Sequence, residues 1–136
     1  MTFHNKVDAG QIEPNFFQDV IDVLNAQPHD FYVHVGNRSR AEQQALHDKY
    51  LAGGPKAASP EHSAHVGENF PDGLSRAVDV TLVIDGKDEW DYQNPAWQAL
   101  VAAIDAHPRL HSGAHFADTD HIEKSGYRAD MTPPNG

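Results

Sequence analysis

Apolar residues recur at helical spacing in two stretches of the chain. In each stretch they occupy positions i, i+3, i+4 and i+7, the pattern of a helix that buries one face. Each stretch opens with a proline, Pro14 or Pro95, and proline is favoured in the first turn of a helix. The pattern predicts helices over 14–26 and from Pro95 to about His107. The apolar positions are Phe17, Val20, Ile21 and Leu24 in the first helix and Trp97, Leu100, Val101 and Ile104 in the second.

A third helix is predicted from its ends. Ser39 and Glu42 have the spacing of a capping box, in which the serine hydroxyl accepts from a first-turn amide and the glutamate reaches back to the serine N–H. The two glycines and the proline at 53–55 are typical of a helix end. We therefore expect a helix from Ser39 to about Leu51.

Alternating residues predict two main strands, 31–35 and 77–84, and two short strands are expected around 114–116 and 121–123. Three helices with few strands predict the α+β class, a small antiparallel sheet with helices packed on it. A length of 136 residues fits one compact domain. We expect residues 1–136 to form a single domain whose tail frays from about residue 130.

The stretch from Gly53 to Ser75 shows no apolar period and is rich in Gly, Pro, Ser and Ala. Such long loops in compact domains are usually functional or disordered. This loop contains His62 and His65. Its segment 66–76 is rich in turn formers, so we expect that segment to be a surface loop beside the site.

Charge and cysteine content narrow the range of partners. A formal net charge of -10 repels phosphate backbones and anionic lipid, which argues against nucleic acid as a partner. No run of apolar residues is long enough to cross a membrane, and the N-terminus lacks an export signal. The chain has no cysteine, so a zinc site must use His and carboxylate ligands. We expect a monomer that does not insert into membranes.

Three polar features stand out as candidates for chemistry. Asp79 lies within an apolar strand, where an unpaired carboxylate is costly. The run Asp118-Thr-Asp-His121-Ile-Glu123 sets carboxylates on both sides of one imidazole, and Ser63-Ala-His65 lies in the long loop. His65, Asp79 and His121 together offer three zinc ligands and leave a fourth tetrahedral position for water, as a catalytic zinc site requires.

At these residues the chain resembles the zinc peptidases of bacterial cell-wall peptides: D-Ala-D-Ala carboxypeptidases, vancomycin-resistance D,D-dipeptidases and phage L-alanyl-D-glutamate endolysins. The family signature S-x-H-x-x-G-x-A-x-D is matched by Ser63-Ala-His65 and, after an insertion, by Ser75-Arg-Ala77-Val-Asp79, in which Ser75 replaces the family's glycine. The later signature D/E-x-x-H-x-D/E is matched by residues 118–123, and G-x-R-S/T followed by Gln is matched by residues 36–39 and Gln43. The resemblance spans about residues 31–124 and implies a hedgehog/D,D-peptidase-like fold.

The resemblance also implies roles for the matching residues. His65, Asp79 and His121 would hold Zn²⁺, and Asp118 would be the general base. Arg38 would stabilise the developing oxyanion or bind a substrate carboxylate. The remaining matches, Glu123, Ser63 and Gln43, would support the site from behind its ligands. Zinc occupancy should fall below about pH 6, since imidazole must be neutral to bind metal.

Alternatives remain for several of these residues. His62 could replace His65 as a ligand, but only His65 has a serine two residues before it. Asp79 could instead pair with Arg76. Asp120 should face away from the site, because neighbouring side chains of an extended segment point to opposite faces. The other histidines match no ligand spacing and are expected to be solvated or to pack: His29, His34, His47, His107, His111 and His115. Trp90 and Tyr92 could line a substrate groove, while Trp97 is expected in the core.

These observations predict a zinc metallopeptidase that hydrolyses stem or cross-bridge peptides of bacterial peptidoglycan, of the phage endolysin type. Such a lysin is made in the host cytoplasm and then acts on the cell wall, which suits the lack of an export signal. The alternatives are a D-Ala-D-Ala carboxypeptidase or dipeptidase, and a non-catalytic module in which zinc only stabilises the fold. A free carboxylate at Asp118 favours catalysis over the structural module.

Overall fold

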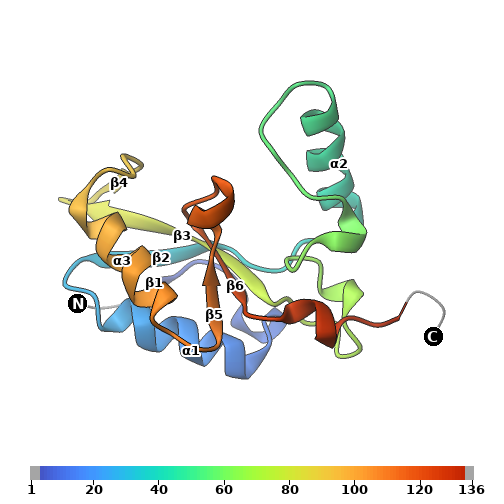
Figure 1. Ribbon diagram of the computed structural model, residues 1–136, viewed down its shortest axis with the longest axis horizontal. Helices are drawn as coiled ribbons and strands as arrows, with labels where there is room; N and C mark the ends of the chain where they lie inside the picture. The colour runs from blue at the N-terminus through green and yellow to red at the C-terminus, as the bar shows by residue number, and fades with distance from the viewer. Residues whose placement is uncertain (1–3, 134–136) are drawn as a thin grey trace.

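A computed structural model describes residues 4–133 of the chain. Its centre is one sheet in the strand order β1-β2-β3-β6-β5, with β4 paired to the remaining length of β3 (Figure 1). The strands are β1 (His4–Asn5), β2 (Asp30–Val35), β3 (Ala77–Ile84), β4 (Lys87–Glu89), β5 (Leu110–Ser112) and β6 (His121–Lys124). Every pair is antiparallel except β1 with β2. The expected α+β class with a small antiparallel sheet is confirmed.

Two helices cover one face of this sheet. They are α1 (Pro14–Asn25) and α3 (Pro95–Asp105), and both begin at the predicted proline (Figure 1). Their apolar stripes meet the core-facing residues of β2 and β3 in one cluster. Trp97 is fully buried there, with its ring edge-on to Phe31 and its indole N–H donating to the Glu89 carbonyl oxygen at 2.8 Å. The expectation that Trp97 belongs to the core is confirmed.

Helix α2 (Arg40–Leu51) differs from the other two. Its capping box is present, because the Ser39 hydroxyl accepts from the Glu42 N–H and the Glu42 carboxylate accepts from the Ser39 N–H. Gln43 is its only buried residue among the described ones, and the helix projects away from the sheet (Figure 1). The predicted helix is therefore correct in its bounds, but it does not pack on the sheet as expected.

The alternation of β3 decides where the polar residues of the sheet lie. Its odd-numbered and even-numbered residues point to opposite faces. Val78, Val80 and Leu82 enter the core under α1 and α3. Asp79 and Thr81 therefore point to the opposite face, away from α1 and α3 (Figure 1). This open face carries the candidate site.

The sequence prediction missed the shortest strands and misplaced another. Asp85 and Gly86, both at positive φ, form the predicted turn, but the turn leads into the short hairpin strand β4. The N-terminal strand β1 was not predicted. Residues 114–116, expected to form a strand, belong to a 3-10 turn (Gly113–Phe116), and the strand lies just before it at Leu110–Ser112.

The segment 66–76 is not a surface loop, contrary to our prediction. Val66, Phe70 and Ser75 are buried, and Phe70 joins Ala64, Ala77 and Tyr127 in a second apolar cluster. Gly67 is packed so tightly that a Cβ there would lie 2.3 Å from the Gly73 carbonyl oxygen. This second core includes Ala64, the residue that precedes His65.

Arg76 completes the second core from its polar side. Its guanidinium lies over the Phe70 ring at 4.4 Å from the centroid and donates to both carboxylate oxygens of Asp72 at 2.6 and 2.9 Å. Asp130 contributes a further ion pair at 3.6 Å. Arg76 therefore pairs with these carboxylates and leaves Asp79 to other partners.

We expect Phe70→Ala to lower the free energy of unfolding by about 3–5 kcal/mol, the usual cost of truncating a buried phenylalanine. The loss arises because Phe70 fills the second core and carries the Arg76 guanidinium on its ring. Urea denaturation followed by circular dichroism measures it, with the exposed Leu51→Ala as control. A loss of stability no larger than that of the control would show that segment 66–76 is a surface loop and not part of a core.

The end of the described chain is tied to this second core. The Thr132 N–H donates to the Asn69 carbonyl oxygen at 2.8 Å, and Met131 packs against the cluster. These two residues are held, although we expected fraying from about residue 130. The last three residues of the predicted tail lie outside the described part. Within residues 4–133, no helix combines the length and apolar character needed to cross a bilayer.

Candidate metal centre

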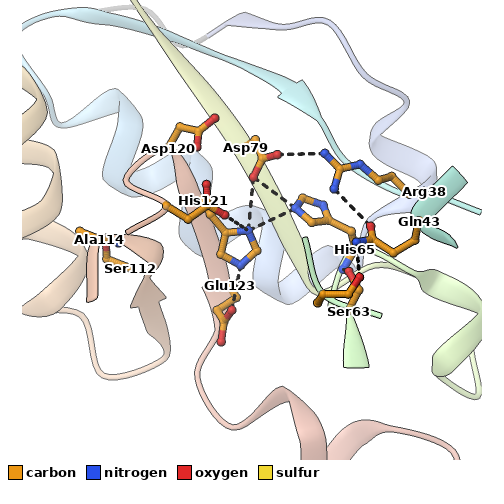
Figure 2. Close-up of polar contacts among 12 residues, drawn as sticks. Arg38, Gln43, Ser63, His65, Asp79, Ser112, Ala114, Asp120, His121 and Glu123 are labelled. Atoms are coloured by element: carbon orange, nitrogen blue, oxygen red, sulfur yellow. Dashed lines mark hydrogen bonds and ion pairs between the residues drawn. The ribbon is translucent and has the colours of Figure 1, made fainter. Parts of the chain in front are cut away.

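Three side-chain atoms of the kind that bind metals converge on the open face of the sheet. His65 Nε2 lies 3.2 Å from Asp79 Oδ1 and 3.2 Å from His121 Nδ1, and the last two atoms are 3.3 Å apart (Figure 2). Ligands at 2.0–2.1 Å from a tetrahedral zinc ion are separated by about 3.3 Å. The triangle therefore has the size of one face of a zinc coordination tetrahedron, and all three side chains are buried.

Strand pairing and the second core bring these residues together. Asp79 on β3 stands directly opposite His121 on β6 in the antiparallel register, so their side chains share one face. His65 approaches from the preceding loop, where the Ser63 hydroxyl accepts from the His65 N–H and the His65 carbonyl oxygen accepts from the Arg38 N–H. His62, the rival ligand, lies apart and hydrogen bonds to Ser59.

Both imidazoles are oriented from behind. His65 Nδ1 lies 2.9 Å from the Gly36 carbonyl oxygen, and His121 Nε2 lies 2.8 Å from Glu123 Oε1. A carbonyl and a carboxylate can only accept, so these two nitrogens carry the protons. The nitrogens that face the centre are then free to bind a metal. A proton on the outer nitrogen, held by a carbonyl or carboxylate, is the usual arrangement of metal-binding histidines.

Arg38 contacts the outer side of Asp79. Its Nη2 lies 3.3 Å from Asp79 Oδ2, while Nη1 donates to Gln43 Oε1 at 3.3 Å. Gln43 is anchored in turn to the Ala58 carbonyl oxygen at 2.9 Å. The chain of contacts fixes the carboxylate so that Oδ1 faces the two histidines (Figure 2). Two nitrogens of the Arg38 guanidinium are thereby engaged with protein groups.

Burial and charge oppose each other at this cluster. Burial alone would raise the pKa of Asp79, but the charge of His65 and hydrogen bonds from His121 and His65 hold that pKa well below its usual range. Burial alone would lower the pKa of His121, but hydrogen bonds to Asp79 and Glu123 and their negative charges raise it to about 10. In the metal-free protein His121 therefore carries an extra proton where a cation would lie.

Zinc affinity is expected to rise about tenfold per pH unit from pH 6 to 8, because the metal must displace this proton. The raised pKa of His121 places the dependence well above the value of about 6 expected for an ordinary imidazole. As the pH falls, the proton competes better and zinc is lost. Competition with a chelator of known affinity at each pH measures the slope. A flat profile over this range would show that His121 gives up no proton on binding.

Asp118 stands at the edge of the cluster. Its Oδ2 lies 3.9 Å from His121 Nδ1, and about half of its side chain is exposed. The chain reaches this position through a turn, since the Asp118 N–H donates to the Gly113 carbonyl oxygen at 2.8 Å and the His121 N–H to the Asp118 carbonyl oxygen at 3.0 Å. Gly113 is required there, because a Cβ would lie 2.2 Å from the Asp118 carbonyl oxygen. Asp118 is thus close to the ligands and open to water.

Asp120 does not face away from the site, and our prediction for it was wrong. Residues 118–120 form a turn rather than an extended segment, so the alternation rule does not apply. Asp120 lies beside Asp79 (Figure 2), with a ligand-type oxygen within 4.8 Å of it. Burial, the charge of Asp79 and a hydrogen bond with Asp118 raise the pKa of Asp120 to about 8.

His34 is the residue of this site that the sequence analysis missed. Its ligand-type nitrogen lies within 4.8 Å of oxygens of both Asp79 and Asp120. Burial is the main influence on its pKa, which lies below the usual value even though Asp79 acts in the opposite direction. The available signal was its alternation on β2, which sets Tyr32 and His34 opposite the core residues Phe31 and Val33.

The fold and the converging side chains define an α+β protein with a candidate metal centre on the open face of its sheet. No protein-family model matches the chain, and no curated protein sequence matches it. Among solved structures, it is similar to the crystal structure of the Serratia marcescens L-Ala D-Glu endopeptidase ChiX, with a TM-score of 0.62 and 21% sequence identity. The match covers 88% of this chain and 84% of that one. At this identity, the likeness is one of fold.

Proposed function

We propose that the protein is a zinc-dependent peptidase that hydrolyses stem or cross-bridge peptides of bacterial peptidoglycan. The observation that carries the proposal is the triangle of His65 Nε2, Asp79 Oδ1 and His121 Nδ1, with the carboxylate of Asp118 at its edge. Two neutral imidazoles and one carboxylate leave the fourth position of a tetrahedral ion open, which is typical of catalytic zinc.

The ligand set suits zinc by its chemistry. Two imidazole nitrogens and one carboxylate oxygen are zinc ligands, and both imidazoles have their outer N–H held by an acceptor. When bound, zinc would polarise the scissile carbonyl as a Lewis acid and lower the pKa of a water molecule to about 7. Glu123 and Gly36 would keep the two rings in place, and Arg38 would keep Asp79 from rotating.

Proton transfer is the task of Asp118 in this proposal. Its carboxylate is exposed enough to meet a water molecule and lies too far from His121 to hydrogen bond to it. It would accept a proton from the attacking water and pass it to the nitrogen of the leaving amine as the C–N bond breaks. A site in which zinc only stabilised the fold would have no use for this carboxylate.

The substrate class is supported by two independent likenesses. The three sequence motifs resemble those of cell-wall peptidases, and the similar solved structure carries the name of an L-Ala D-Glu endopeptidase. Within this class we propose the endolysin type, which acts on the wall after synthesis in the host cytoplasm. An endopeptidase of this kind would cut within the stem peptide.

Mass spectrometry of fragments released from purified peptidoglycan tests the proposed function. The zinc-loaded protein should release peptides with new amino termini and leave the glycan strands uncut. Protein stripped of metal by a chelator should release none until zinc is restored. Release of sugar fragments alone, or of nothing by the zinc-loaded protein, would reject a peptidase.

A further inference from the structure

His34 occupies an irregular position in the sheet beside the candidate metal centre. On β2, Val33 pairs with Val80 and Val35 pairs with Asp79, so His34 is an extra residue without a pairing partner on β3. Such bulges are common next to active sites, where they redirect a side chain. The imidazole lies on the same face as Thr81 and Asp79.

The ring of His34 is fixed on three sides. Its Nδ1 lies 2.8 Å from Oγ1 of Thr81, which is fully buried. Its ring packs edge-on against Trp90 at 5.7 Å and Tyr32 at 6.1 Å between centroids. These contacts hold the imidazole in one orientation. A side chain held in this way needs no reordering when a ligand binds, which is an advantage at a binding site.

The other nitrogen of the ring has no hydrogen-bond partner among the described residues. His34 Nε2 lies 3.9 Å from Asp120 Oδ2, which is beyond hydrogen-bond distance. About 29% of the His34 side chain remains exposed. Nε2 is therefore oriented, next to the ligand Asp79, and available to a bound molecule.

We propose that His34 is a further catalytic residue, whose Nε2–H donates a hydrogen bond to the carbonyl oxygen of the peptide bond that is cut. The inference rests on the proposed peptidase function. This role requires the neutral ring with its proton on Nε2. Nδ1 then accepts a hydrogen bond from the Thr81 hydroxyl, and Nε2 donates to the substrate. His34 would stabilise the negative charge that develops on this oxygen, while the proton transfers remain with Asp118.

Arg38, the donor to the oxyanion expected from the sequence, already contacts other protein groups. Its two terminal nitrogens already contact Asp79 and Gln43, so the oxyanion role expected for it from the sequence competes with a positioning role. His34 has no such commitment at Nε2. Arg38 follows the end of β2, whereas His34 lies within that strand.

Variants at His34 test this inference. His34→Ala should lower kcat on peptidoglycan-derived peptides by about 100-fold, the usual effect of losing one donor to an oxyanion, with little change in KM. His34→Gln should recover at least part of the loss, since an amide N–H can donate. The matched control is His29→Gln, because His29 is exposed and lies outside the site. Zinc content and thermal unfolding are measured for every variant.

Binding supplies a second readout. A phosphinate analogue of the L-Ala–D-Glu dipeptide carries a tetrahedral anionic centre in place of the scissile carbonyl. Calorimetry should show about 100-fold weaker binding of this analogue to zinc-loaded His34→Ala than to the parent protein. If His34→Ala does not fold, both quantities are measured on His34→Gln instead. Its kcat and its affinity for the analogue should then lie between those of the parent protein and those of an inactive enzyme.

The outcomes separate this inference from the proposed function. A parent protein that cuts peptides while His34→Ala and His34→Gln keep full kcat and analogue affinity would overturn the role of His34 alone. A loss of bound zinc in either variant would make His34 part of the metal centre and would also overturn it. A parent protein that cuts no peptide would remove the proposed function, and the inference with it.

Discussion

Asp118→Asn is expected to slow release of peptides from peptidoglycan by about 100-fold to 10,000-fold, the usual cost of removing a general base. The amide cannot accept the proton of the attacking water. Zinc content and thermal stability should change little, because Asp118 lies 3.9 Å from the nearest ligand nitrogen and is half exposed. Mass spectrometry measures the rate of fragment release, and elemental analysis measures the zinc content.

Two comparisons make this test specific. Asp85→Asn changes a carboxylate in an exposed turn and should leave the rate unaltered. Asp120→Asn should cost less than Asp118→Asn, because the new amide can still hydrogen bond to the Asp118 carboxylate. Near-parental activity in Asp118→Asn, or a larger loss in Asp120→Asn, would assign the base elsewhere.

His65→Ala and His121→Ala are each expected to reduce bound zinc from one ion per chain to none after dialysis against micromolar zinc. Replacing groups behind metal ligands already costs about 10-fold to 100-fold in affinity, and removing a ligand should cost more. Activity should fall with the zinc. Elemental analysis and chelator competition measure the loss in each variant.

His62→Ala provides the matched control for the ligand test. His62 was the alternative ligand on sequence grounds, but it hydrogen bonds to Ser59 and lies outside the converging group. This variant should keep its zinc. Full retention of zinc in both His65→Ala and His121→Ala would end the proposal for this metal centre, whatever the activity.

The regular elements could be predicted because their signals are local. Helices α1 and α3 repeat their apolar residues at i, i+3, i+4 and i+7 and begin at a proline, and α2 carries its capping box within four residues. Strand β3 is long enough for alternation to be visible. Strands β1 and β4 contain two and three residues, too few for any period to appear.

The second core could not be predicted because its partners are far apart in the chain. Phe70 lies among turn formers and was assigned to the surface, but Tyr127 and Met131 cover it from the C-terminal end. Burial of this kind depends on tertiary contacts alone. The two carboxylates that hold Arg76, Asp72 and Asp130, are likewise 58 residues apart.

The candidate site likewise contains residues that the sequence predicts and residues that it does not. Motif spacing selected His65, Asp79 and His121, and the structure brings these three together. Asp120 was misplaced because the segment before His121 turns, which depends on the close approach of Gly113 to Asp118. His34 was not predicted as a site residue. It lies near Asp79 because β2 pairs with β3, and the spacing of ligands along the chain gives no sign of this pairing.

Zinc-edge anomalous diffraction from crystals grown with zinc would locate a bound ion and its ligands in one measurement. We expect one peak, about 2.0–2.2 Å from His65 Nε2, Asp79 Oδ1 and His121 Nδ1, with the fourth position free of protein atoms. Asp118 should lie outside the bonding distance. A peak at other residues, or a fourth protein ligand that closes the coordination shell, would contradict a catalytic zinc at this site.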